Sequence, residues 1–188
     1  MLFISYLSEN SDYSKELIDY MGKSRILEGL QTIVLASIVN QFEISVFKQA
    51  DITDVNLDEL YYNTISYFGD YDSIMNALYG DKEHLDYWRL VALEHVGYYI
   101  SYAMSYIPTF EIYSLAKEDI EKGKEAYKKV YNTGEHKMTD FFDVIKDASL
   151  YNPFEEEAYE LIAKLKWNKT IWHICLKIIK YSLRKELY

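Results

Sequence analysis

The sequence predicts an all-α protein in the form of a helical bundle, and three observations lead to this fold class. The chain of 188 residues contains only 7 glycines and 2 prolines, which favours long uninterrupted helices. Apolar residues recur at helical spacing in most segments. No segment shows the sustained alternation of apolar and polar residues that is typical of strands. The length suits one domain with a sizeable core.

The first half of the chain is expected to begin with a short helix and a long one. Residues 12–23 predict a helix that ends near Gly22. Residues 24–49 predict one long helix with a broad buried face, since apolar residues recur at helical spacing. These are Leu27, Leu30, Val34, Ile38 and Phe42.

The next two elements are shorter. Residues 56–69 should form a helix, because Asn56 is a favourable N-cap, Glu59 follows three positions later and Gly69 is a stop signal. Residues 70–81 predict a short helix or a turn.

Helical patterning returns from residue 81 to about residue 117, interrupted by Gly97 and Pro108. Pro108 has no backbone N–H, so we expect it to kink or restart the helix. Residues 116–134 predict an amphipathic surface helix that closes at Gly134.

The last elements carry clear start signals. Residues 139–148 predict a short helix with Thr139 as its cap. The following helix should start at Asn152 as cap, with Pro153 in the first helical position and Glu155 in the third.

Two regions are expected along the chain: a helical region over residues 1–165 and a basic amphipathic helix over residues 166–188. The simplest interpretation of the second region is a terminal helix docked on the body. The alternative is a helix that binds a partner or a membrane surface, because basic residues border its apolar face.

Composition and charge exclude several classes of function. A net charge of −10 argues against a nucleic-acid partner. The one cysteine, Cys175, cannot form an internal disulfide and fits a reducing compartment, so we expect a cytoplasmic protein. The N-terminus does not resemble a signal peptide, and we expect neither a membrane-spanning helix nor a membrane-surface partner.

The sequence contains no zinc-peptidase motif of the form His-Glu-x-x-His, and its four histidines are scattered, so no metal site and no bound cofactor are expected. Two acids, Glu43 and Glu94, have apolar surroundings. Each is either solvated at a helix edge or a perturbed acid of the kind that gathers at functional sites.

The stretch "LEHVGYYISYAMSYIP" is the strongest candidate site. On a helix, His95, Tyr98 or Tyr99, and Tyr102 share one face. Gly97 lets another backbone or a peptide approach closely. These side chains can donate hydrogen bonds to a peptide carbonyl or to an oxyanion formed on it. The alternative is a tyrosine-rich core helix whose hydroxyls are satisfied internally.

Two segments together resemble a known family. "GYYISYAMSYIPTFEIYSLAKEDIEKGKEAYKKVY" and then "FFDVIKDASLYNPFEEEAYELIAKL" resemble the C-terminal part of the catalytic domain of oligoendopeptidase F-like and thimet oligopeptidase-type zinc peptidases. The matching residues are Tyr98, Tyr99, Tyr102, Ala103, Pro153, Phe154, Glu155 and the earlier pair Phe42 and Glu43. An ungapped alignment places Val91 at the family's usual histidine position and His95 at a tyrosine position.

The resemblance implies a C-terminal fragment or truncated homologue of a zinc-dependent oligopeptidase. It implies that His95, Tyr98, Tyr99 and Tyr102 bind substrate and that Tyr102 is the candidate oxyanion stabiliser. In the intact family the zinc ligands precede this region, so the chain alone is expected to lack metal-dependent hydrolysis. Expected partners are oligopeptides and either a complementary zinc-binding half or a second copy of the chain. The alternative function is a non-catalytic helical module that binds peptides or proteins.

Overall fold

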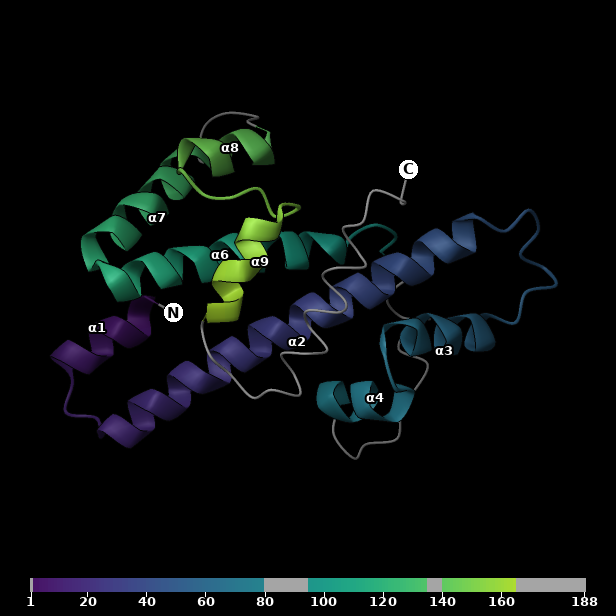
Figure 1. Cartoon of the computed structure of the whole chain (residues 1–188), viewed down its shortest axis with the longest axis horizontal. Helices are drawn as coiled ribbons and strands as arrows, with labels where there is room; N and C mark the ends of the chain where they lie inside the picture. Colours follow the sequence, from purple (N-terminus) through teal and green to yellow (C-terminus); the bar gives the residue numbers. More distant parts are fainter. Residues whose placement is uncertain (1, 80–94, 135–139, 165–188) are drawn as a thin grey trace. The chain divides into compact units, whose positions relative to one another are not determined.

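The computed structural model describes residues 2–79, 95–134 and 140–164. In these ranges every regular element is a helix, which confirms the all-α prediction (Figure 1). The elements are α1 (Leu2–Asn10), α2 (Lys15–Phe47), α3 (Leu57–Phe68), α4 (Tyr71–Tyr79), α6 (Ile100–Glu118), α7 (Ile120–Gly134), α8 (Phe141–Asp147) and α9 (Glu156–Lys164).

The described residues pack as two compact units, and α2 and α6 contribute to both. The first unit contains residues 2–29, 106–134 and 140–164, which include α1, α7, α8 and α9. The second contains residues 30–79 and 95–105, which include α3 and α4. The predicted boundary between regions 1–165 and 166–188, and the predicted basic terminal helix, lie outside the described residues.

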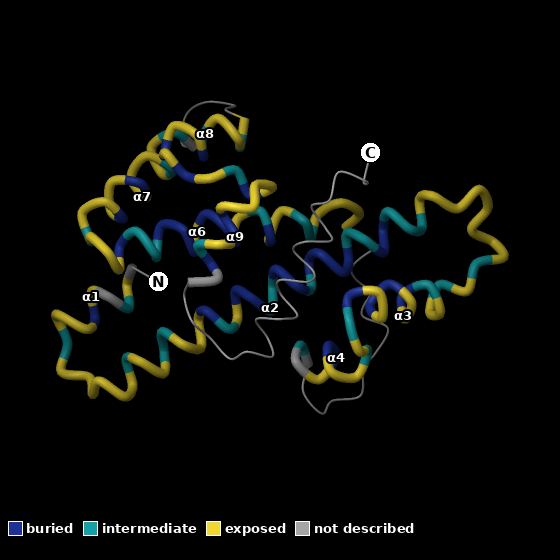
Figure 2. The backbone as a smooth tube through the Cα atoms, viewed as in Figure 1, coloured by how far each residue is buried: buried dark blue, intermediate teal, exposed yellow. Residues whose placement is uncertain are grey.

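The predicted break near Gly22 is wrong, because α2 continues from Lys15 to Phe47. Glycine ends a helix when it adopts a left-handed conformation, and Gly22 does not. A second glycine of α2, Gly29, allows close packing: a Cβ there would lie 2.7 Å from Cζ of Phe110 and 2.8 Å from Cδ1 of Tyr106. The first turns of α2 are largely exposed and its later turns largely buried (Figure 2).

By length and composition α2 could cross a membrane, although half of its most apolar window is buried inside the protein. The core helix of a soluble protein has the same properties. The expectation of no spanning helix and the cytoplasmic location therefore stay predictions.

The core of the second unit lies between α2 and α3. Phe42 meets Tyr61 edge to face, with ring centroids 5.3 Å apart. Ile65, Phe68 and Ile74 are also buried. The predicted bounds of α3 are confirmed, since the Asn56 side chain accepts the N–H of Glu59 and Gly69 is the C-cap.

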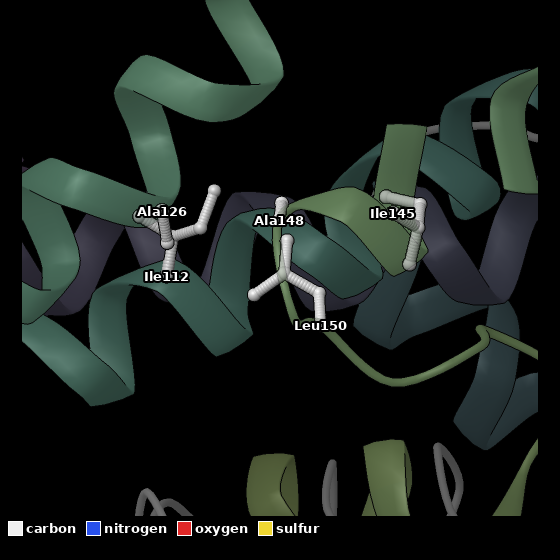
Figure 3. Close-up of a cluster of buried hydrophobic side chains, with 5 residues drawn as sticks. All are labelled: Ile112, Ala126, Ile145, Ala148 and Leu150. Atoms are coloured by element: carbon white, nitrogen blue, oxygen red, sulfur yellow. The ribbon is translucent and has the colours of Figure 1, made fainter. Parts of the chain in front are cut away.

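The core of the first unit includes five buried side chains from α6, α7, α8 and the turn after α8, shown in Figure 3. They are Ile112, Ala126, Ile145, Ala148 and Leu150. The turn keeps Leu150 in this cluster because α8 ends in a Schellman motif: Leu150 N–H donates to Ile145 C=O, and Ser149 N–H to Lys146 C=O. Ser149 adopts the left-handed φ of 59° that this motif requires.

Three predicted details of the later helices need correction. The observed cap of α8 is Asp140, whose side chain accepts the N–H of Phe142, and Thr139 lies outside the described residues. The last helix begins at Glu156, because Asn152 and Pro153 lie in a turn before it. The Pro153 C=O accepts the hydroxyl of Tyr159. Of the two alternatives at Pro108, the restart is wrong, since α6 runs through that residue, and the kink stays a prediction.

Candidate functional site

The candidate site lies where a turn at residues 95–99 leads into α6. Gly97 has a φ of 72°, in the left-handed region that favours glycine. The N–H of Tyr98 donates to the C=O of His95 over 3.1 Å, and the N–H of Tyr102 to the C=O of Tyr99 over 3.0 Å. This tight turn places the aromatic residues on both sides of Gly97 close together.

A buried acid on α2 holds the turn. The Gly97 N–H donates to both carboxylate oxygens of Glu43, at 3.1 and 3.2 Å. Glu43 is only 5% exposed. Burial raises the pKa of its carboxyl group, and the Gly97 N–H partly offsets that rise. Of the two alternatives for Glu43, the structure therefore shows the buried, perturbed acid, whereas Glu94 lies outside the described residues.

The four predicted site residues come together as one aromatic cluster, here called the tyrosine cluster: His95, Tyr98, Tyr99 and Tyr102. Tyr98 lies at its centre, with ring centroids 5.5 Å from His95, 6.0 Å from Tyr99 and 5.3 Å from Tyr102. The Tyr102 hydroxyl donates to the Tyr98 hydroxyl over 3.0 Å. The helix predicted from residue 81 to about residue 117 is wrong at residues 95–99, which form a turn. The four residues therefore meet through this turn and the start of α6, and not on one face of a helix.

The tyrosine cluster is open to solvent. Tyr98 is 50% exposed and Tyr102 39% exposed. The alternative interpretation, a tyrosine-rich core helix, requires these two rings to be buried, and they are not. The hydrogen bond to Tyr98, together with partial burial, raises the pKa of the Tyr102 phenol. The phenol is consequently neutral at physiological pH and keeps the proton that it donates to Tyr98.

A second buried acid, Glu111 on α6, was not predicted. Both of its carboxylate oxygens lie 3.0 Å from the N–H of Tyr151, and the residue is 3% exposed. Burial raises its pKa to about 7, partly offset by the Tyr151 N–H. The signal was present in the sequence, because the triplet Phe-Glu-Ile occurs at residues 42–44 and again at 110–112.

Glu43 and Glu111 make the same kind of contact, each in a different unit. Each follows a fully buried phenylalanine, and each binds one backbone N–H from a distant part of the chain with both oxygens. Glu111 fastens the segment between α8 and α9 to α6, next to the core cluster of Figure 3. Glu43 fastens the turn that leads into the tyrosine cluster.

A hollow of about 310 Å³ lies elsewhere, in the first unit. Its lining includes Phe142, Lys146 and Glu155. The lining contains none of the four predicted site residues, so the tyrosine cluster stays the candidate site.

The residues that the structure describes include no group of three or more His, Cys, Asp or Glu side chains that could hold a metal ion. They therefore do not fit the zinc that the resemblance associates with the intact family.

No protein-family model matches the chain, and no curated protein or solved structure shows significant similarity to it. The site geometry and the sequence resemblance are the two grounds for a functional proposal.

Proposed function

We propose that the chain is a helical peptide-binding homologue of the C-terminal part of zinc-dependent oligopeptidases, and that the tyrosine cluster contacts the peptide. The observation that carries the proposal is the exposure of Tyr98 and Tyr102 beside His95. Large exposed aromatic rings with polar tips suit a surface that is covered by a partner.

The chemistry of the tyrosine cluster suits a peptide. The hydrogen bond between Tyr98 and Tyr102 uses one of their two phenolic protons, so the other can donate to an acceptor outside the pair. A peptide carbonyl is such an acceptor, while the ring faces offer apolar contact to neighbouring side chains. The chain's net charge of −10 disfavours the phosphate backbone of nucleic acid as an alternative partner.

Hydrolysis is not part of the proposed activity of the chain by itself. The sequence contains no His-Glu-x-x-His, and zinc would have to be held by a complementary half. The resemblance implies that Tyr102 donates to the oxyanion in such an assembly. Its hydroxyl would then have to turn away from Tyr98, to which it donates in this structure. A metal analysis joined to a peptidase assay tests this point. Stoichiometric zinc with turnover by the purified chain would contradict it.

Peptide binding is tested by titrating fluorescently labelled, unstructured oligopeptides with the full chain and following anisotropy. We expect saturable binding that an excess of unlabelled peptide reverses. Absence of binding at millimolar protein would contradict the proposed function. The alternative of a membrane-surface helix concerns residues 166–188, and liposome co-sedimentation with and without them tests it.

A further inference from the structure

We infer that Glu43 is a positioning residue of the tyrosine cluster: its buried carboxylate binds the Gly97 N–H and thereby sets where Tyr98 and Tyr102 stand. The inference rests on the proposed function only in so far as the tyrosine cluster binds peptide. The placement of the rings by Glu43 can be measured with no ligand present.

The contact between Glu43 and Gly97 joins two residues that are distant in sequence and close in space. Glu43 and Gly97 are 54 positions apart, and both carboxylate oxygens lie within 3.2 Å of one nitrogen. Glu43 is built into α2, between the buried Phe42 and the half-buried Ile44. The carboxylate is therefore held by a regular helix, while the group it binds belongs to a turn.

The link continues from Gly97 to the rings in two steps. Tyr98 directly follows Gly97, so a shift of the Gly97 peptide moves the Tyr98 backbone. Tyr98 then meets Tyr102 edge to face and accepts its hydroxyl proton. The turn can form here because Gly97 has a positive φ, and nothing lies within 4 Å of the place where its Cβ would be. Through its hydrogen bond to the Gly97 N–H, Glu43 of α2 constrains the turn and therefore the position of the Tyr98 ring.

A purely stabilising role explains Glu43 less well. A carboxylate buried among apolar side chains is costly, and an apolar residue at the same position would avoid that cost. What the carboxylate adds is a directional bond to one N–H at the start of the tyrosine cluster.

Glu111 provides an internal control. It has the same preceding phenylalanine, the same burial and the same two contacts to one N–H, but it binds Tyr151 in the first unit. Replacing Glu111 disturbs a buried carboxylate of the same kind without touching the Gly97 turn. An effect on the tyrosine cluster that is specific to Glu43 therefore separates positioning from general destabilisation.

The experiment compares wild-type protein with Glu43→Gln, Glu43→Leu and Glu43→Asp, and with Glu111→Gln and Glu111→Leu as controls. Two quantities are measured on the full chain: the hydrogen-exchange protection of the Gly97 amide by NMR, and the affinity for the labelled oligopeptide. Glu43→Gln retains an oxygen acceptor, so protection and affinity should stay close to wild type. Glu43→Leu has no acceptor, so protection should be lost and affinity should fall about tenfold.

Glu43→Asp keeps the charge but withdraws the carboxylate by one methylene, so it should show the same loss in a milder form. This variant keeps the inference testable if Glu43→Leu does not fold. Both Glu111 variants should bind peptide like wild type. Unchanged affinity in Glu43→Leu, or equal losses in Glu43→Leu and Glu111→Leu, would overturn the inference.

The two proposals fail in different ways. If wild-type protein binds no peptide, the proposed function fails, while Gly97 protection and the contact between the Tyr98 and Tyr102 rings still report on Glu43. If the Gly97 amide is unprotected in wild type, or protected in Glu43→Leu, the positioning role fails even when peptide binds.

Discussion

Tyr102 donates a hydrogen bond to the hydroxyl of Tyr98 over 3.0 Å, and the two rings meet edge to face with centroids 5.3 Å apart. Tyr98 lies in the turn that precedes α6, and Tyr102 lies in the first turn of α6. Their pairing therefore depends on how the preceding turn positions Tyr98. The pair is exposed, which makes its hydroxyls available to a ligand at little cost in protein stability.

Removing either hydroxyl should weaken peptide binding more than folding. Tyr98→Phe and Tyr102→Phe each break the bond within the pair and remove one donor, so we expect affinity to fall about threefold to tenfold. Stability should change by less than about 1 kcal/mol, because both side chains are exposed. The control is Tyr127→Phe, since Tyr127 is 50% exposed and stacks on Tyr131 in the first unit. An equal loss of affinity in the control would contradict the role of the tyrosine cluster.

The raised pKa of Glu111 predicts a pH-dependent stability with a definite sign. The carboxyl titrates near its ordinary value of 4.5 when unfolded and at about 7 when folded, so the folded state binds the proton more tightly. Its contribution to the free energy of unfolding is therefore complete below pH 4.5 and is lost as the pH rises to 7.

The size of this loss should be about 2 kcal/mol, allowing for partial solvent screening. Urea unfolding of wild type and Glu111→Gln at pH 5 and pH 8 measures it. The drop in stability between these two conditions should be smaller in Glu111→Gln by that amount. Equal drops in the two proteins would contradict the assignment.

The two glycines of α2 should respond oppositely to alanine. At Gly29 the new Cβ would lie within 2.9 Å of three ring atoms of Phe110 and Tyr106, so Gly29→Ala should destabilise the protein by about 1–3 kcal/mol. At Gly22 the nearest atom would be Cγ2 of Ile4 at 3.6 Å, an ordinary contact. Gly22→Ala should therefore stabilise the helix by about 0.5–1 kcal/mol. The thermal unfolding midpoints of the two variants test both predictions. Destabilisation by Gly22→Ala would argue against a continuous α2.

Ser149 occupies the left-handed position of the Schellman motif that ends α8. Glycine adopts that conformation without the steric cost that a Cβ brings, so Ser149→Gly should stabilise the protein by about 1 kcal/mol. The matched control is Ser66→Gly, at an exposed position inside α3, which should destabilise by about 0.5 kcal/mol. Denaturant midpoints give both values, and destabilisation in both variants would contradict the motif.

Local signals in the sequence predicted the features that depend on neighbouring residues. Asn56, Glu59 and Gly69 marked α3 correctly, since capping is decided within one helical turn. The tyrosine stretch was located because its members are close in sequence. Its exposure could not be predicted, since an apolar helix face looks the same whether it is covered or open.

The features missed depend on contacts between distant residues. Gly22 predicts a stop, but it does not adopt the left-handed conformation of a helix end, and α2 continues from Lys15 to Phe47. Pro153 predicts a first helical residue, but it lies in a turn in which Asn152 accepts the N–H groups of Phe154 and Glu155, and α9 begins at Glu156. The contact of Glu111 cannot be predicted from local signals, because its partner is 40 positions away. The repeated Phe-Glu-Ile triplet is the signal in the sequence that marks this acid.

The most direct test of the account is an NMR titration of isotopically labelled full chain with an unstructured oligopeptide. The account predicts that shift changes gather at His95, Tyr98, Tyr99 and Tyr102 and at the Gly97 amide, and that they saturate together. Shift changes that gather instead in the hollow beside Phe142 and Lys146, or no changes at millimolar peptide, would contradict it.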